Sequence, residues 1–104
     1  MNTMKTATIN LIIISLMEQE AEIKKAVQIA ETRKETLYQD MLDFELLYNA
    51  NWENEAIGLQ LDEACDRYGE AYEEASKEEE RLEAIQEAIK YLREASGILE
   101  WLES

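Results

Sequence analysis

Residues 49–56 read NANWENEA and lie almost at the midpoint of a chain of 104 residues. On both sides, apolar residues recur at the spacing of one helix face, and in the middle of the chain this pattern is interrupted only here. Asn49 and Asn51 favour a turn, because asparagine tolerates left-handed backbone and bonds neighbouring amides. We therefore expect a bend between two long helices, with Trp52 packed between the helix ends as its anchor.

The same stretch carries a start signal for the second helix. Asn51 is a candidate N-cap, because its side-chain oxygen can accept from the first free backbone amides of a helix. Glu53 and Glu55 would then fall in the first turn, where the positive end of the helix dipole favours carboxylates.

The first predicted helix covers residues 8–48 and carries an apolar seam. Successive seam positions are alternately four and three residues apart, which is the heptad pattern of paired helices. Such a helix would be about 60 Å long, so it should lie along another helix instead of inside a globular core. The seam consists of Ile9, Ile13, Leu16, Glu20, Ile23, Val27, Ala30, Lys34, Leu37, Met41, Phe44 and Tyr48.

The second predicted helix covers residues 55–102 and repeats the pattern. The middle of its seam contains Ala71, Ala75 and Glu78, which either permit close approach of another helix or leave a weak spot. The full seam is Ile57, Leu61, Ala64, Tyr68, Ala71, Ala75, Glu78, Leu82, Ile85, Ile89, Leu92, Ser96 and Leu99.

The predicted fold class is all-α: two long antiparallel helices, residues 8–48 and 55–102, form a helical hairpin around a bend at residues 49–54. Folding back at the bend would set Phe44 near Leu61, Ile23 near Leu82, and Leu16 near Ile89. Because two helices cover each other along one stripe only, we expect two hairpins to assemble into a four-helix-bundle dimer. The residues expected to pack are Ile13, Leu16, Ile23, Val27, Leu37, Phe44, Leu61, Leu82, Ile85 and Ile89.

Two seam positions of the first helix are charged, and they suggest an arrangement of that dimer. Glu20 and Lys34 lie equally far from Val27. In an antiparallel homodimer centred on Val27, Glu20 of one chain would face Lys34 of the other, so that the two charges pair. The alternative is that both side chains extend to the rim of the seam, where water reaches their charged ends.

The N-terminal run at residues 6–17, TATINLIIISLM, has two interpretations. Behind Lys5 it could be a signal-peptide core, but no small-residue cleavage site follows it closely. It is too short for a transmembrane helix, which needs about 20 residues. Its apolar positions continue in phase with the heptads, which favours a buried helix start. The run is apolar around most of the helix circumference, so one neighbouring helix cannot cover it, which favours a second chain. The residues concerned are Ile12, Ile13, Ile14 and Leu16.

Composition narrows the class of partner. The chain carries 24 acidic and 10 basic residues, a formal net charge of -14. Nucleic acid and anionic membrane surfaces should therefore be repelled, whereas a basic protein surface is favoured. The absence of proline and the presence of only three glycines fit uninterrupted helices. Tyr72, Tyr91 and Trp101 lie off or beside the seam, where they are either candidate contact points or ordinary scattered surface residues.

Nothing in the sequence indicates catalysis. There is no histidine, so the usual proton shuttles, catalytic triads and most zinc sites have no candidate ligand. Cys65 has no histidine to activate it, and no glycine-rich phosphate loop is present. We expect no enzyme, no catalytic or metal-binding residue, no cofactor and no small-molecule substrate.

The motif NANWENEA resembles the bend of the WXG (ESAT-6-like) proteins, small helical hairpins handled by type VII secretion systems. In that family a Trp-Xaa-Gly turn joins two long helices in a chain of about this length. Trp52, Glu53, Glu55 and Ala56 stand where members often carry Trp, an acidic residue, a polar residue and Ala. Asn54 replaces the glycine, and asparagine is the residue that best substitutes where a positive φ is needed.

Exported members of the family usually carry an aromatic residue followed four positions later by Asp or Glu. Here Tyr91 is followed by Ala95, and Tyr72 by Ser76. The resemblance therefore implies a cytoplasmic hairpin that is either exported with a partner, without a cleaved signal peptide, or retained as an adaptor or chaperone. The implied partners are a second copy, another helical hairpin, or the helical N-terminal domain of a larger secreted toxin.

Two further functions are compatible with the sequence. An intracellular acidic inhibitor or antitoxin-like protein for a basic partner would account for the charge, though not for the tryptophan bend. A structural coiled-coil subunit without a role in secretion would account for the seams. The effect of salt distinguishes the helical secretion partner from the acidic inhibitor. A complex of buried apolar seams resists salt, whereas a complex held by charge does not.

Overall fold

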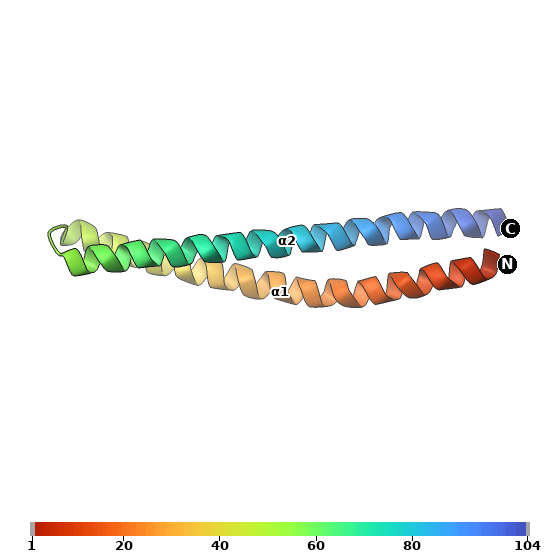
Figure 1. Ribbon diagram of the computed structural model, residues 1–104, viewed down its shortest axis with the longest axis horizontal. Helices are drawn as coiled ribbons and strands as arrows, with labels where there is room; N and C mark the ends of the chain where they lie inside the picture. Colours follow the sequence, from red (N-terminus) through yellow and green to blue (C-terminus); the bar gives the residue numbers. More distant parts are fainter. Residues whose placement is uncertain (1, 104) are drawn as a thin grey trace. The chain divides into compact units, whose positions relative to one another are not determined.

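The computed structural model describes the backbone of residues 2–103 and the side chains of residues 5–102. It consists of two helices, α1 (Asn2–Ala50) and α2 (Glu55–Glu103), joined by a bend at residues 51–54 (Figure 1). The described residues contain no strand, and the predicted all-α helical hairpin is confirmed. α1 is longer than expected, since it begins before residue 8 and continues through Asn49 and Ala50, whereas α2 begins at Glu55 as predicted and ends one residue later than predicted.

The helices pair in two compact units. The bend unit is Ala26–Glu78, and the terminal unit is the described part of Met1–Lys25 and Glu79–Ser104. Within each unit a segment of α1 lies antiparallel to a segment of α2 (Figure 1). Over the residues described, neither α1 nor α2 contains a stretch that could span a lipid bilayer.

The terminal unit has an aliphatic interior. Ile13 of α1 and Ile85 and Ile89 of α2 form its buried centre. Fully burying one such side chain contributes roughly 1.5–3 kcal/mol. The half-buried residues packed against this centre are Ile9, Leu16, Ile23, Leu82 and Leu92. The predicted neighbours Ile23 and Leu82, and likewise Leu16 and Ile89, therefore belong to one cluster.

A polar contact interrupts this interior. The hydroxyl Oγ of Ser96, which is buried, lies 2.9 Å from Oδ1 of Asn10 and donates a hydrogen bond to it. Thr6 is also buried in this unit. A polar pair of this kind favours one register of the two segments, because sliding them would leave buried polar atoms without partners.

The bend unit is built differently, around small side chains. Its most buried residues are alanines, and Ala71 and Ala75 are each only 1% exposed. The thin middle of the second seam is therefore covered by its neighbours and does not form an open gap. Ala30 of α1 and Ala64 of α2 are buried as well.

Aromatic and charged contacts flank these alanines. The rings of Tyr38 and Tyr68 lie with their centroids 5.3 Å apart. Lys34 Nζ lies 5.3 Å from the centroid of Tyr72, a cation–π contact between the helices. One turn forward along α1, from Lys34 to Tyr38, thus corresponds to one turn back along α2, from Tyr72 to Tyr68. This is the antiparallel register of the bend unit.

The heptad seams account for the burial of both helices. Each predicted seam position of α1 and of α2 is buried or half-buried, and none is exposed. This includes the charged seam residues Glu20, Lys34 and Glu78. The alternation of four and three residues therefore identified the inward faces correctly.

Candidate functional site: the bend and the helix-pairing surfaces

Asn51 terminates α1. Its backbone N–H donates to the carbonyl oxygens of Leu47 and Tyr48, at 3.0 and 3.1 Å. Its side-chain Nδ2 also donates to the Leu47 oxygen, at 3.1 Å. The prediction that Asn51 caps the second helix is wrong, because its side-chain amide donates to a carbonyl oxygen at the end of the first helix.

Asn54 is the N-cap of α2. Its Oδ1 accepts from the backbone N–H groups of Ala56 and Ile57, at 3.0 and 3.3 Å. Its carbonyl oxygen accepts from the N–H of Gly58 at 3.1 Å, the first hydrogen bond of the helix. Two of the four N–H groups that a helix start leaves unpaired are thereby satisfied by one side chain.

The cap position decides where the two glutamates of the bend fall. Glu55 lies in the first turn of α2, as predicted. Glu53 precedes the cap, so its predicted place in the first turn is wrong.

The turn itself needs no left-handed residue. The N–H of Asn54 donates to the carbonyl oxygen of Asn51 at 2.9 Å, closing a four-residue turn with Trp52 and Glu53 at its centre. Among the described residues, no non-glycine residue has a positive φ. The expectation of a left-handed Asn54 in place of glycine is therefore wrong. Asn54 is the last residue of the turn, and its φ is not positive.

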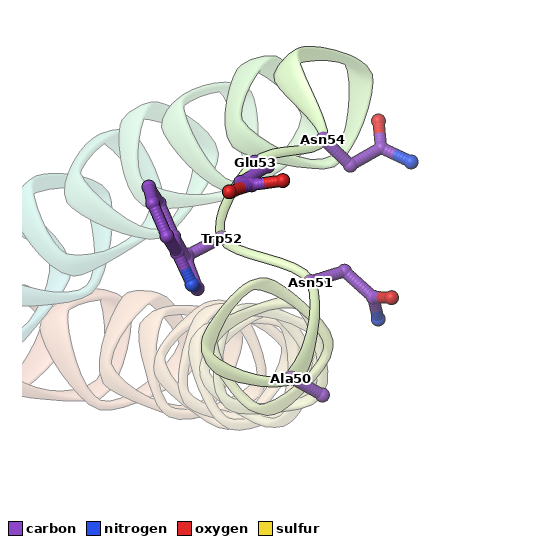
Figure 2. Close-up of a pocket in the computed structure, with 5 residues that line it drawn as sticks. All are labelled: Ala50, Asn51, Trp52, Glu53 and Asn54. Atoms are coloured by element: carbon purple, nitrogen blue, oxygen red, sulfur yellow. The ribbon is translucent and has the colours of Figure 1, made fainter.

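Trp52 is not packed between the helix ends. Its side chain is 68% exposed. Figure 2 shows Trp52 and Glu53 on one side of the bend and the amides of Asn51 and Asn54 on the other. The prediction that Trp52 packs between the helix ends is therefore wrong, and Tyr48 packs beside Gly58 there.

The predicted packing residues separate between the two units. Six of them lie together in the aliphatic interior of the terminal unit: Ile13, Leu16, Ile23, Leu82, Ile85 and Ile89. The other four are half-buried in the bend unit: Val27, Leu37, Phe44 and Leu61.

The two charged seam residues have different surroundings. Lys34 Nζ lies 3.0 Å from Glu31 Oε2 on the same helix, in addition to its contact with Tyr72. Its side chain retains 27% exposure. Glu20 is half-buried in the terminal unit. The pairing of Glu20 with Lys34 of a second chain stays a prediction, in which Lys34 would exchange Glu31 for another carboxylate.

Large apolar side chains remain exposed in the terminal unit. On α1, Ile13 and Leu16 pack as expected, whereas Ile12 and Ile14 are exposed, as are Leu11 and Met17. On α2 the exposed set is Tyr91, Ile98, Trp101 and Leu102. Sequence reasoning named Tyr91 and Trp101 and missed Ile98 and Leu102, although their spacing from Tyr91 could have identified them.

The acidic surface shows no arrangement typical of a metal site. Among the residues described, no group of three or more His, Cys, Asp or Glu side chains is placed to hold a metal ion. Cys65 is exposed and carries a free thiol. The hollow at the bend, lined by Ala50–Asn54, is open to solvent (Figure 2).

Comparison of the chain with protein-family models, with curated proteins and with solved structures finds no match.

Proposed function

We propose that this chain is a non-enzymatic, WXG-like helical-hairpin protein of a type VII secretion system. It acts by packing helix against helix, either as a secreted effector partner or as an adaptor or chaperone for a larger secreted toxin. Its partner is a second copy or another protein with a helical hairpin or helical N-terminal domain.

The observation that carries this proposal is the apolar surface of the terminal unit. Leu11 and Ile14 on α1, and Tyr91, Ile98 and Leu102 on α2, are each more than half exposed. Large apolar side chains exposed on both helices of one unit favour an interaction site there. A second pair of helices would bury them and complete a four-helix bundle.

The bend supports the family assignment. It joins two helices of 49 residues each through the short segment at residues 51–54, and Trp52 lies at its centre. Because Trp52 is exposed in the single chain, its indole is available for contact with a partner.

Co-purification and export together test the proposal. The chain would be tagged in its native cell and isolated at low and at high salt, and the bound proteins identified by mass spectrometry. A helical partner that stays bound at high salt, and whose appearance outside the cell requires both this chain and a working type VII system, is the expected result. A partner exported equally well without this chain would refute the proposal.

The charge favours a second candidate, an acidic inhibitor or antitoxin-like protein for a basic partner. The formal net charge of -14 would hold such a partner mainly by long-range attraction. Recovery of a basic enzyme that is released when salt is raised, and whose activity is blocked in the complex, would support this function in place of the first.

A further inference from the structure

A second apolar stripe runs along α2 in the terminal unit. Its positions alternate by four and three residues, like the inward seam, but lie on a different face of the helix. Tyr91 and Ile98 on this stripe are 70% and 60% exposed. The stripe comprises Ala84, Ala88, Tyr91, Ala95, Ile98 and Leu102, whereas the seam toward α1 comprises Leu82, Ile85, Ile89, Leu92, Ser96 and Leu99.

The stripe has the form of a docking face for a helix. Its six positions extend from residue 84 to residue 102, which corresponds to about 27 Å of helix. Ala84 is exposed, and Ala88 and Ala95 are half-buried, so three of the six positions carry small side chains, and Ala95 lies between Tyr91 and Ile98. A partner helix could place large side chains over the alanines and receive Tyr91 and Ile98 between its own turns.

One edge of the stripe is acidic. Glu80, Glu87 and Glu94 recur at every seventh residue, and all three are exposed. The next position in this series is Trp101, which is 74% exposed. In a pair of helices, positions of this kind flank the apolar seam and determine the choice of partner by charge.

This acidic edge argues against a second copy at the stripe. Two antiparallel copies joined through it would set the edge of one against the same edge of the other, placing carboxylates opposite carboxylates. Like charges facing each other across an interface oppose association. Lys or Arg at the flanking positions of a different helix would instead pair with these glutamates.

We infer that the outer stripe of α2 binds an amphipathic helix with basic flanking residues, supplied by a different protein. This inference rests on the proposed helix-pairing function and specifies its face and the chemistry of its partner. The apolar seam of the partner provides burial, and its basic edge provides selection and orientation.

Three synthetic peptides of about 20 residues test this with the full chain, by isothermal titration calorimetry. The first carries Leu at the seam positions and Lys at the flanking positions, and the second replaces the flanking Lys by Glu. The third has the composition of the first in scrambled order, which keeps its charge and removes its apolar face. We expect the first to bind one-to-one and at least about tenfold more tightly than either control.

A matched pair of variants locates the contact. Ile98→Asp alters the stripe, whereas Ile29→Asp alters an isoleucine that is 70% exposed on α1 in the bend unit. Because both side chains are exposed, both variants should keep the helicity and unfolding midpoint of the native chain, as measured by circular dichroism. Ile98→Asp should weaken binding of the first peptide by about tenfold or more, and Ile29→Asp by less than about twofold.

Four results would overturn the inference. Equal binding of the scrambled peptide means that charge alone is recognised. Equal binding of the Glu-flanked peptide removes the role of the acidic edge. Equal loss of peptide binding in Ile98→Asp and Ile29→Asp would show that the stripe is not the binding site. If no peptide binds although export of a helical partner requires this chain, the face is wrong and the proposed function stands. If the first peptide binds at the stripe although export is independent of the chain, the inference stands and the proposed function is wrong.

Discussion

Tyr48 packs against Gly58 across the bend, at the point where α1 and α2 are closest in sequence. A methyl group at position 58 would lie 3.2 Å from Cε2 of Tyr48, which is tighter than ordinary van der Waals contact. Because Gly58 has no side chain, the ring of Tyr48 fits beside it. A methyl group at Gly69, farther along α2, would meet open space within 4 Å, apart from its chain neighbours and the backbone of its own helix.

These two glycines should respond differently to alanine. Both lie inside a helix, where alanine is favoured by about 1 kcal/mol. Gly69→Ala should gain roughly 0.5–1 kcal/mol of unfolding free energy. Gly58→Ala should be less stable than Gly69→Ala by about 1 kcal/mol or more, because crowding displaces Tyr48. Urea unfolding of both variants measures the difference, and equal gains would show that the tyrosine ring moves aside at no cost.

Removing the N-cap should weaken the start of α2. Asn54→Ala loses the acceptor for two backbone N–H groups and should cost about 1 kcal/mol, whereas Asn54→Asp keeps it. Asn54→Gly should cost only a few tenths of a kcal/mol. Denaturant unfolding compares the three. A glycine variant more stable than the native chain would mean that residue 54 needs a positive φ after all.

Trp52 should matter little to the stability of the single chain. Because its side chain is 68% exposed, Trp52→Ala should change the unfolding free energy by no more than about 0.5 kcal/mol. Acrylamide should quench its fluorescence efficiently in a Trp101→Phe background, which removes the second indole. A large loss of stability together with a protected indole would indicate that the tryptophan anchors the bend.

The alanines of the bend unit should not tolerate larger side chains. Ala75→Leu inserts three carbons where the native side chain is 1% exposed, and it should cost about 1–3 kcal/mol. Ala84→Leu is the control, because Ala84 is exposed on the same helix and its enlargement should be neutral within about 0.5 kcal/mol. Equal stability of the two variants in thermal unfolding would show that the helices separate easily at Ala75.

A charge exchange tests the homodimer centred on Val27. Lys34→Glu should weaken self-association, and Glu20→Lys added to it should restore association by exchanging the two charges. Sedimentation equilibrium measures the dimer. Since Lys34 also contacts Glu31 and Tyr72 within its own chain, unfolding of each variant must be recorded as a control. Failure of the double variant to recover would rule out the pairing.

The sequence predicted the inward faces of both helices because burial follows the spacing of apolar residues. Ile85 and Ala71 differ greatly in size, yet both occupy seam positions and both are buried. Spacing alone does not give the distance between the helices, so it left open whether Ala71 permits close approach or weakens the pair. In the structure, neighbouring atoms cover Ala71 almost completely, so the middle of the seam is not an open gap.

The local chemistry of the bend was harder to predict. Asn51 and Asn54 have the same side chain, and either could cap a helix. Which one does so depends on where α1 stops, and helix ends are weakly determined by sequence because the last turn can be extended or shortened at little cost. The exposure of Trp52 was missed for a related reason. Tyr48, at the last seam position of α1, is also an aromatic residue that could fill the space between the helix ends, and the spacing does not say which of the two does so.

The hydrogen bond between Ser96 and Asn10 joins residues that are 86 positions apart, whereas Tyr48 and Gly58 are ten positions apart. Closing the longer loop directly from the unfolded chain would cost about 2 kcal/mol more in entropy. We therefore expect folding to start at the bend and to proceed as a zipper toward the chain ends. The stripe on α2 would then be formed late in folding, and a newly made chain could meet its partner helix while its own two ends are still closing.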